Sequence, residues 1–391
     1  MPHTATDRFL LRSLRDPEPR LESFDPTEWE ALWVKARTHC LTPYLEERWR
    51  RSGILERMPP AVAQRFTAAR RMNLERNRRL AAHLGVAAAA LESAGVPALV
   101  VKGLHLAERC YGDLGLRVLY DLDLVIRPED RARALQTLSG LGYVPFDGLA
   151  GPSADLLWSP RDYRWDAEGV FDPERPVLID LQTQLWPPGW HGFRVRSALD
   201  PWSDHRWAEL GAARLRVPSD EKLLVELTVH YAFNALEAHA RLMHLVDVAL
   251  LAEVAAATLD WERFLAEADR SRVGRFCFLT LELARAVCDC RIPDEIRGRL
   301  QREIPRAVLR WLERSAAAAP LAMDLYARDR SAIYALHWAM ASGWRERTEV
   351  LGYSLAEPWR EAGRARRYGP FARRMAARLV EVTRSAARTR R

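Results

Sequence analysis

Two aspartates, Asp121 and Asp123, are separated by a single leucine in an apolar run of the sequence. In a β-strand, successive side chains point to opposite faces, so these two carboxylates share one face. Adjacent carboxylates repel each other and are costly to desolvate, and a divalent cation relieves both penalties. The pair therefore predicts a metal site. The alternative is a solvated strand end, or ion pairs to Arg117 and Arg127.

A third acid, Asp180, lies inside the apolar, β-branched run Val177–Gln182, which predicts another strand. A carboxylate in the middle of such a strand needs a partner or a chemical role. It either joins an ion pair within the sheet or faces the first two aspartates.

The elements that must position these acids are a strand, a glycine turn, a helix and a strand between Val96 and Arg127. The first apolar run stops at Lys102-Gly103, an amphipathic segment follows, and the second run carries the aspartates. We expect His105 and Glu108 on the surface of the intervening helix.

The flanking sequence reads as helical on both sides. Residues 1–95 predict a helical N-terminal module, in which one helix opens at Pro26 and a long one follows Pro59-Pro60. Residues 218–391 predict a helical C-terminal module with a basic tail, whose first helix is capped by Ser219. Arg241 and Asp247 lie on apolar helices there, and indicate a buried polar network or contacts to a ligand.

Residues 96–217 form the predicted central core. After Pro128 a helix runs from Arg131 to Leu138 and ends near two glycines, and Tyr143–Phe146 reads as a short edge strand. Residues 147–175 have no clear period and predict a loop with at most a short strand.

Composition indicates an ordinary globular protein of 391 residues, 48% of them hydrophobic, with a net charge of +7. No apolar run approaches the ~18 residues that span a bilayer, and the first residues lack a signal-peptide core, so no membrane is expected and the cytoplasm is inferred. Five scattered cysteines fit reduced thiols. Most of the basic excess lies in residues 360–391, where an apolar stripe predicts a final packed helix or, alternatively, a helix that binds RNA or a membrane surface.

Taken together, the sequence resembles the nucleotidyltransferases of the DNA polymerase β-like superfamily, in particular a bacterial branch with a Lys-Gly turn. The resemblance covers most of residues 25–260. It is carried by an ordered set of motifs, namely Lys102-Gly103-Leu104, Tyr111-Gly112-Asp113, Arg117, Asp121-Leu122-Asp123 and Gly142-Tyr143.

The resemblance implies an α+β fold, with a small mixed sheet and flanking helices between helical N- and C-terminal modules. It implies an enzyme that moves a nucleoside monophosphate from a nucleoside triphosphate to an acceptor and releases pyrophosphate. Asp121, Asp123 and Asp180 would be catalytic and would hold two Mg²⁺ ions, with Mn²⁺ as an alternative. Lys102, Gly103 and Arg117 would bind the nucleotide phosphates.

The acceptor stays open, because the fold and the metal site do not determine it. A peptide or protein side chain, a small molecule and an RNA end are all compatible. The competing hypothesis is a catalytically inactive relative that binds a nucleotide or a partner protein.

Overall fold

A seven-stranded mixed sheet occupies the centre of the chain, as the predicted α+β fold requires. The computed structural model describes residues 4–146, 154–159, 163, 169–196, 199–210, 213–237, 239–322 and 331–353. The strands follow the order β3-β4-β5-β2-β1-β7-β6, in which β2 pairs with β5 and β1 with β7 in parallel, and the other neighbours are antiparallel. Their bounds are β1 Leu99–Val100, β2 Leu122–Val125, β3 Val144–Pro145, β4 Ala154–Trp158, β5 Leu178–Gln182, β6 Arg206–Leu210 and β7 Ala213–Val217.

The sheet confirms the predicted strands and adds a hairpin that the sequence did not predict. β3 is the expected edge strand, and β4 is the short strand allowed for between residues 147 and 175. The β6–β7 hairpin forms the opposite edge. In this hairpin Trp207 is 45% exposed and lies beside the guanidinium groups of Arg214 and Arg216. Because a large apolar side chain lies on its exposed face, the hairpin shows only a weak alternation of buried apolar and exposed polar residues.

Four N-terminal helices precede the sheet, and their starts follow from local sequence. Asp25 caps one helix through a reciprocal capping box with Glu28, and Pro26 occupies its first turn. The long helix begins at Pro60, directly after the predicted break. The bounds are α1 Ala5–Arg15, α2 Pro26–Thr38, α3 Thr42–Arg51 and α4 Pro60–Ser93.

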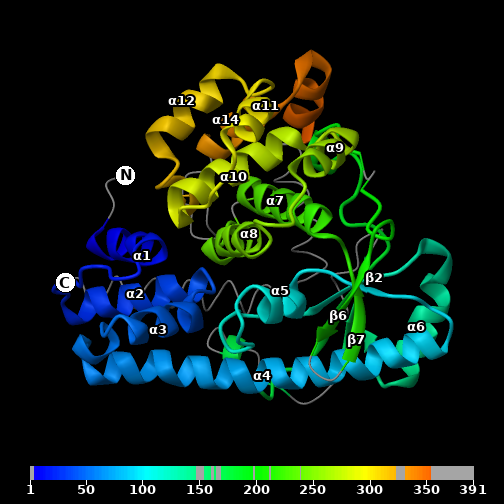
Figure 1. Ribbon diagram of the computed structural model, residues 1–391, viewed down its shortest axis with the longest axis horizontal. Coiled ribbons are helices and arrows are strands. Elements are labelled where there is room, and N and C mark those ends of the chain that lie inside the picture. The colour runs from blue at the N-terminus through cyan, green and yellow to red at the C-terminus, as the bar shows by residue number, and fades with distance from the viewer. Residues whose placement is uncertain are drawn as a thin grey trace.

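The long helix α4 joins the N-terminal helices to the sheet. In Figure 1 it runs beneath α2 and α3 at one end and beneath β6 and β7 at the other. Phe66 and Ala69, near its start, belong to the hydrophobic cluster of the helical modules, whereas Leu80 and Leu91 pack with the sheet. One rigid element therefore supports both parts of the molecule, together with α6 (Arg131–Gly140) on the sheet side.

The C-terminal helices follow the sheet in the chain and lie above it in Figure 1. The first begins after Ser219, as predicted, but the Ser219 hydroxyl is buried and caps no backbone amide within the described residues. The N- and C-terminal helices share one hydrophobic cluster, and the division into three modules stays a prediction. The bounds are α7 Asp220–Leu236, α8 Leu242–Val254, α9 Trp261–Ser271, α10 Gly274–Cys288, α11 Asp294–Gln301, α12 Arg306–Ser315, α13 Ala319–Ala322 and α14 Ser331–Met340.

The predicted tail helix around Phe371 lies outside the described residues. Within the described ranges, every helix is either too short or too polar to cross a lipid bilayer.

Candidate active site

The predicted strand, turn, helix and strand are present as β1, α5 (Gly103–Arg109) and β2. Lys102 and Gly103 both adopt positive φ angles, 52° and 33°. Lysine rarely adopts such a conformation, whose cost is typically ~1–3 kcal/mol, and strain of this kind concentrates at functional sites. The turn brings Gly103 against the Asp123 carboxylate, since a Cβ atom at Gly103 would lie 3.7 Å from Oδ2.

Two of the three predicted acids, Asp123 and Asp180, lie on two adjacent parallel strands, and Asp121 lies in the bend just before β2. Asp123 on β2 is the direct register partner of Asp180 on β5, and Asp121 lies two residues before Asp123. Residues in register on parallel strands present their side chains to the same face. Leu122 and Leu124 point the other way, into the core beneath the sheet. The register places Asp123 and Asp180 on one face, whereas a face shared with Asp121, which precedes the strand, stays a prediction.

The electrostatics of Asp121 show that the carboxylates act on one another. Burial, together with the negative charges of Asp123 and Asp180, raises the pKa of Asp121 to about 7, while Lys102 and Arg117 oppose the shift. The folded protein therefore brings these negative charges close together, and their repulsion lowers its stability.

This repulsion predicts a pH-dependent gain in stability for Asp121→Asn. The pKa of Asp121 is about 7 in the folded protein against an ordinary 3.8, so between these pH values only the folded state keeps the proton. Wild-type stability then falls as pH rises through that window. We expect the variant to gain on wild type by at least ~1 kcal/mol between pH 5 and pH 8, since one pKa unit corresponds to ~1.4 kcal/mol. Urea unfolding with a chelator present measures it, and an equal stability difference at both pH values would contradict the repulsion.

Lys102 bridges the sheet and the first C-terminal helix. Its ammonium nitrogen lies 2.9 Å from Glu226 Oε1 on α7 and 3.4 Å from Asp123 Oδ1. Burial disfavours the charged lysine, but the carboxylates of Asp123 and Glu226 outweigh burial and raise the Lys102 pKa. Lys102 is therefore a buried cation that partly neutralises the site.

The three carboxylates suit a hard divalent cation. Such a cation prefers oxygen ligands, and its charge would offset the repulsion among them. In the structure, however, two of these carboxylates are hydrogen-bonded or paired to protein groups, Asp123 to Lys102 and Asp180 to the Gln182 amide. Within the described part of the chain, no three His, Cys, Asp or Glu side chains are already arranged to hold a metal ion. The metal site thus stays a prediction that requires side-chain rearrangement.

Arg117, the third predicted phosphate ligand, is buried in a different pairing. Its Nε and Nη2 donate to the two Asp247 carboxylate oxygens of α8, both at 2.8 Å, and the Tyr111 hydroxyl donates to Oδ1 at 2.7 Å. Asp247 is fully buried. This is the polar network expected at Asp247, and it ties the turn before β2 to the C-terminal helices. A nucleotide contact by Arg117 stays a prediction.

The segment leading into Asp121 is held by polar residues of α4 that the sequence analysis did not single out. The amides of Asn73 and Asn77 both donate to the Arg117 carbonyl, at 3.0 and 2.8 Å, and Arg76 donates to the Tyr120 carbonyl at 3.4 Å. All three α4 side chains are buried. Their only sequence signal is that they share the apolar face of a long helix.

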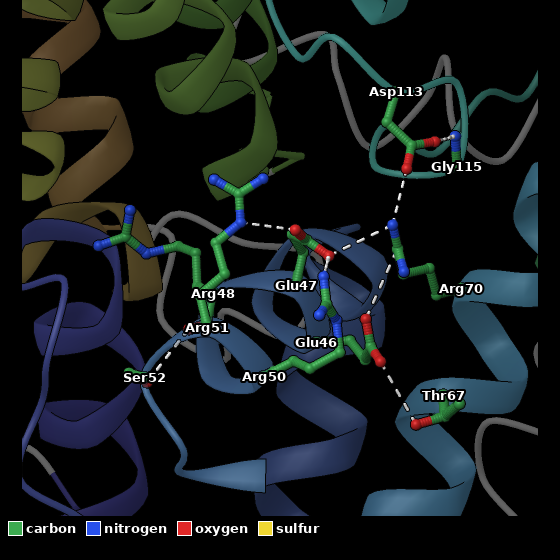
Figure 2. A network of polar contacts seen from close by, with 10 residues as sticks. All are labelled: Glu46, Glu47, Arg48, Arg50, Arg51, Ser52, Thr67, Arg70, Asp113 and Gly115. Atoms are coloured by element: carbon green, nitrogen blue, oxygen red, sulfur yellow. Dashed lines mark hydrogen bonds and ion pairs between the residues drawn. The ribbon is translucent and has the colours of Figure 1, made fainter.

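A second set of polar contacts fixes the same turn from outside. Figure 2 shows Arg70 of α4 between the acids of α3 and the turn, 3.5 Å from Glu46, 3.2 Å from Glu47 and 2.7 Å from Asp113. Asp113 in turn accepts a hydrogen bond from the Gly115 amide at 2.7 Å. The turn is therefore positioned by α3 and α4 before the chain enters β2.

Further arginines lie near Asp121. Arg241 and Arg175 flank the ring of Tyr120, with guanidinium carbons 4.4 and 5.3 Å from its centroid. Asp121 interacts electrostatically with both of them and with Arg76. Neither Arg76 nor Arg241 forms an ion pair within the described residues, so their charge is not neutralised there as that of Lys102 and Arg117 is.

The expectation that His105 is a surface residue was wrong. Its side chain is buried, because α5 packs against β2, β6 and α8. Neither ring nitrogen has a hydrogen-bond partner within the described residues. Burial and the nearby charges of Arg206 and Arg109 lower the pKa of His105 to about 3, so the ring is neutral.

Comparison with known proteins points to one family. Residues 25–289 match the model of a family described as an uncharacterised nucleotidyltransferase. No curated protein matches the chain. Similar solved structures include a crystal structure of ANT(2″)-Ia in complex with adenylyl-2″-tobramycin (16% identity, TM-score 0.34, 49% of this chain and 96% of that chain). Another is a solution structure of the antibiotic-resistance factor ANT(2″)-Ia (18% identity, TM-score 0.32, 50% and 94%).

Proposed function

Since the chain belongs to this uncharacterised nucleotidyltransferase family and is a transferase, we propose that it moves a nucleoside monophosphate from a nucleoside triphosphate to a hydroxyl acceptor and releases pyrophosphate. The observation that carries the proposal is the register of Asp123 with Asp180, beside Asp121.

Asp121, Asp123 and Asp180 are the residues that would hold divalent cations, two Mg²⁺ ions or Mn²⁺ in their place. Such ions neutralise charge on the attacking and leaving oxygens of a phosphoryl group. The protein supplies a rigid pair of strands for the acids, and α4 fixes the segment before them. Protonated Asp121 would be a poor ligand, so cation binding should also release its proton.

Lys102, Gly103 and Arg117 are the proposed nucleotide-binding residues. Gly103 permits close approach of the backbone to a phosphate. Lys102 is close enough to Asp123 to exchange that carboxylate for a phosphate oxygen when a cation binds the acid. Arg117, which is held by Asp247, contributes positive charge next to the carboxylates.

The arginine cluster beside Asp121 supports binding of a triphosphate. Guanidinium groups bind phosphate oxygens through paired hydrogen bonds. Among these arginines, Arg241 is the best placed to bind a phosphate. It is partly exposed, and its side chain makes no cap hydrogen bond that a phosphate would have to break. The carboxylates would bind the cation of a metal-bound nucleotide, and the arginine cluster would bind its negatively charged phosphates.

Arg241→Gln tests this contact. The variant keeps a planar side chain on Tyr120 but removes the charge, and a charge-assisted hydrogen bond is worth ~1.5–3 kcal/mol, or roughly ten- to a hundred-fold in affinity. We expect that loss for Mg²⁺–tripolyphosphate in calorimetric titration. Arg263→Gln, in an exposed pair with Asp204, is the control and should bind like wild type. Unchanged affinity of the Arg241 variant would remove it from the site.

The function itself is tested by label transfer. Each of the four nucleoside triphosphates, labelled at the α-phosphate, is incubated with the protein, Mg²⁺ and hydroxyl-bearing acceptors, and pyrophosphate release is followed in parallel. The proposal predicts α-label on an acceptor in equal amount to pyrophosphate. Release of inorganic phosphate without label transfer would show a hydrolase instead.

A further inference from the structure

A cavity of about 200 Å³ lies beside the proposed active site, between one face of α7 and the segment that follows β5. Its polar lining comes from Glu226, His230, Asn234 and Glu237, and its apolar lining includes Trp186 and Trp190. Three of the polar residues recur along one face of α7, and Glu237 follows directly at its C-terminal end. The cavity has room for a group about the size of one sugar ring or one amino-acid side chain.

Glu226 connects the cavity to the carboxylates. Its side chain is 3% exposed, and its Oε1 accepts from Lys102, which also lies against Asp123. Its other oxygen, Oε2, is buried and has no hydrogen-bond partner within the described structure. A buried carboxylate oxygen without a donor is unfavourable, so a ligand in the cavity would gain a hydrogen bond once the Glu226 side chain turns Oε2 toward it.

The cavity disfavours anions. Burial opposes ionisation of Glu237, but hydrogen bonds from His191 and His239 hold its pKa at about 2, so it is charged at neutral pH. A second carboxylate, Glu226, lies on the same wall. Glu226 adds less negative charge than Glu237, because it is paired with Lys102 and burial raises its pKa. Phosphates of a nucleotide or of an RNA end would be repelled chiefly by Glu237, whereas neutral hydroxyl and cationic amine groups would not.

The apolar wall is preorganised. The Trp190 ring is stacked between Phe233 and His191, with ring centroids 3.7 and 3.8 Å away. Trp186 is held by a hydrogen bond from its ring nitrogen to the Arg196 carbonyl at 3.0 Å. Fixed aromatic side chains suit the apolar face of a ring or an aliphatic segment, and they lose little freedom on binding.

We propose that this cavity binds the acceptor of the transfer, a neutral or cationic hydroxyl-bearing group of a small molecule or a peptide side chain, with Glu226 Oε2 accepting a hydrogen bond from that hydroxyl. This rests on the proposed function and adds to it the class of acceptor. The hydroxyl would then lie next to Lys102, whose ammonium group also contacts Asp123.

The test offers three classes of acceptor to the full chain with Mg²⁺ and the nucleoside triphosphate that binds. These are tyramine and glucosamine as small molecules, a cationic peptide with serine and tyrosine, and an RNA oligonucleotide. We expect label on the small molecules or the peptide and not on RNA. The first two arms distinguish a free compound from a side chain.

Two variants then place the acceptor in the cavity. Val229→Phe, which fills the cavity, should raise the acceptor KM roughly ten-fold or more and leave the nucleotide Kd unchanged. Glu226→Gln, which preserves shape, should raise the acceptor KM to a similar extent, and its nucleotide Kd is measured separately because Glu226 pairs with Lys102. Val254→Phe is the matched control, because Val254 is exposed. Thermal unfolding checks each fold, and Glu226→Gln alone suffices if the larger side chain prevents folding.

Three results would overturn the inference while leaving the nucleotide site intact. They are transfer to RNA, an unchanged acceptor KM in the folded variants, and no transfer in the first two arms although nucleotide binds. Wild-type protein that binds no nucleoside triphosphate would instead refute the proposed function, and the acceptor role of the cavity with it.

Discussion

Replacing Asp123 with asparagine is expected to slow nucleotidyl transfer by roughly a thousand-fold or more, equivalent to ~4 kcal/mol in the activation barrier. Asp123 is linked to several parts of the site, since it pairs in register with Asp180, lies against Gly103 and contacts Lys102. Asparagine has the same shape but lacks the charge that a divalent cation requires.

The variant should fold normally, because Lys102 keeps Glu226 as a partner and the repulsion on Asp121 is reduced. Single-turnover rates with a labelled nucleotide measure the chemical step, and circular dichroism checks the fold. Asp204→Asn, an exposed acid distant from β2 in sequence, is the control. A rate within a few-fold of wild type would exclude Asp123 from the chemistry.

Replacing Asp247 with alanine is expected to destabilise the protein by ~3–5 kcal/mol, because it leaves the buried charge of Arg117 without its partner. Asp247 is fully buried and accepts hydrogen bonds from Arg117 and Tyr111. The loss should appear as a lower denaturant midpoint. It should also loosen the turn before β2, so that nucleotide affinity falls even in the fraction that remains folded.

A double substitution separates the ion pair from simple packing. Arg117→Met with Asp247→Leu removes both charges, and replacing a buried pair with apolar side chains of similar volume is often close to neutral. The double variant should therefore be more stable than Asp247→Ala alone. Tyr111→Phe should cost less, ~1.5–3 kcal/mol, the usual value of one hydrogen bond to a charged group. If Asp247→Ala were as stable as wild type, the pair would not support this part of the fold.

The sequence predicted those parts of the site that depend on local pattern. The β1–α5–β2 unit follows from two apolar runs around a Lys-Gly turn, whereas the common face of Asp121 and Asp123, expected from strand periodicity, stays a prediction. Its resemblance to nucleotidyltransferases was confirmed by the family match.

Contacts between distant segments were not predictable in the same way. Arg117 and Asp247 are 130 residues apart, and nothing local indicates that the two are partners. The same holds for Lys102 with Glu226. Asn73 and Asn77 share the apolar face of a long helix, but nothing local indicates which backbone carbonyl they bind. His105 was misjudged because a short helix packed on several sides has no solvent-facing stripe.

The central claim is that Asp121, Asp123 and Asp180 form a metal-dependent nucleotide site, and Mn²⁺ binding tests it without knowledge of the acceptor. Electron paramagnetic resonance of free Mn²⁺ is followed as wild type or Asp123→Asn is added, with and without a nucleoside triphosphate. We predict that wild type binds Mn²⁺ and nucleotide together, each strengthening the other, and that the variant loses this coupling. Equal Mn²⁺ binding by wild type and Asp123→Asn, with nucleotide affinity independent of the metal in both, would contradict the account.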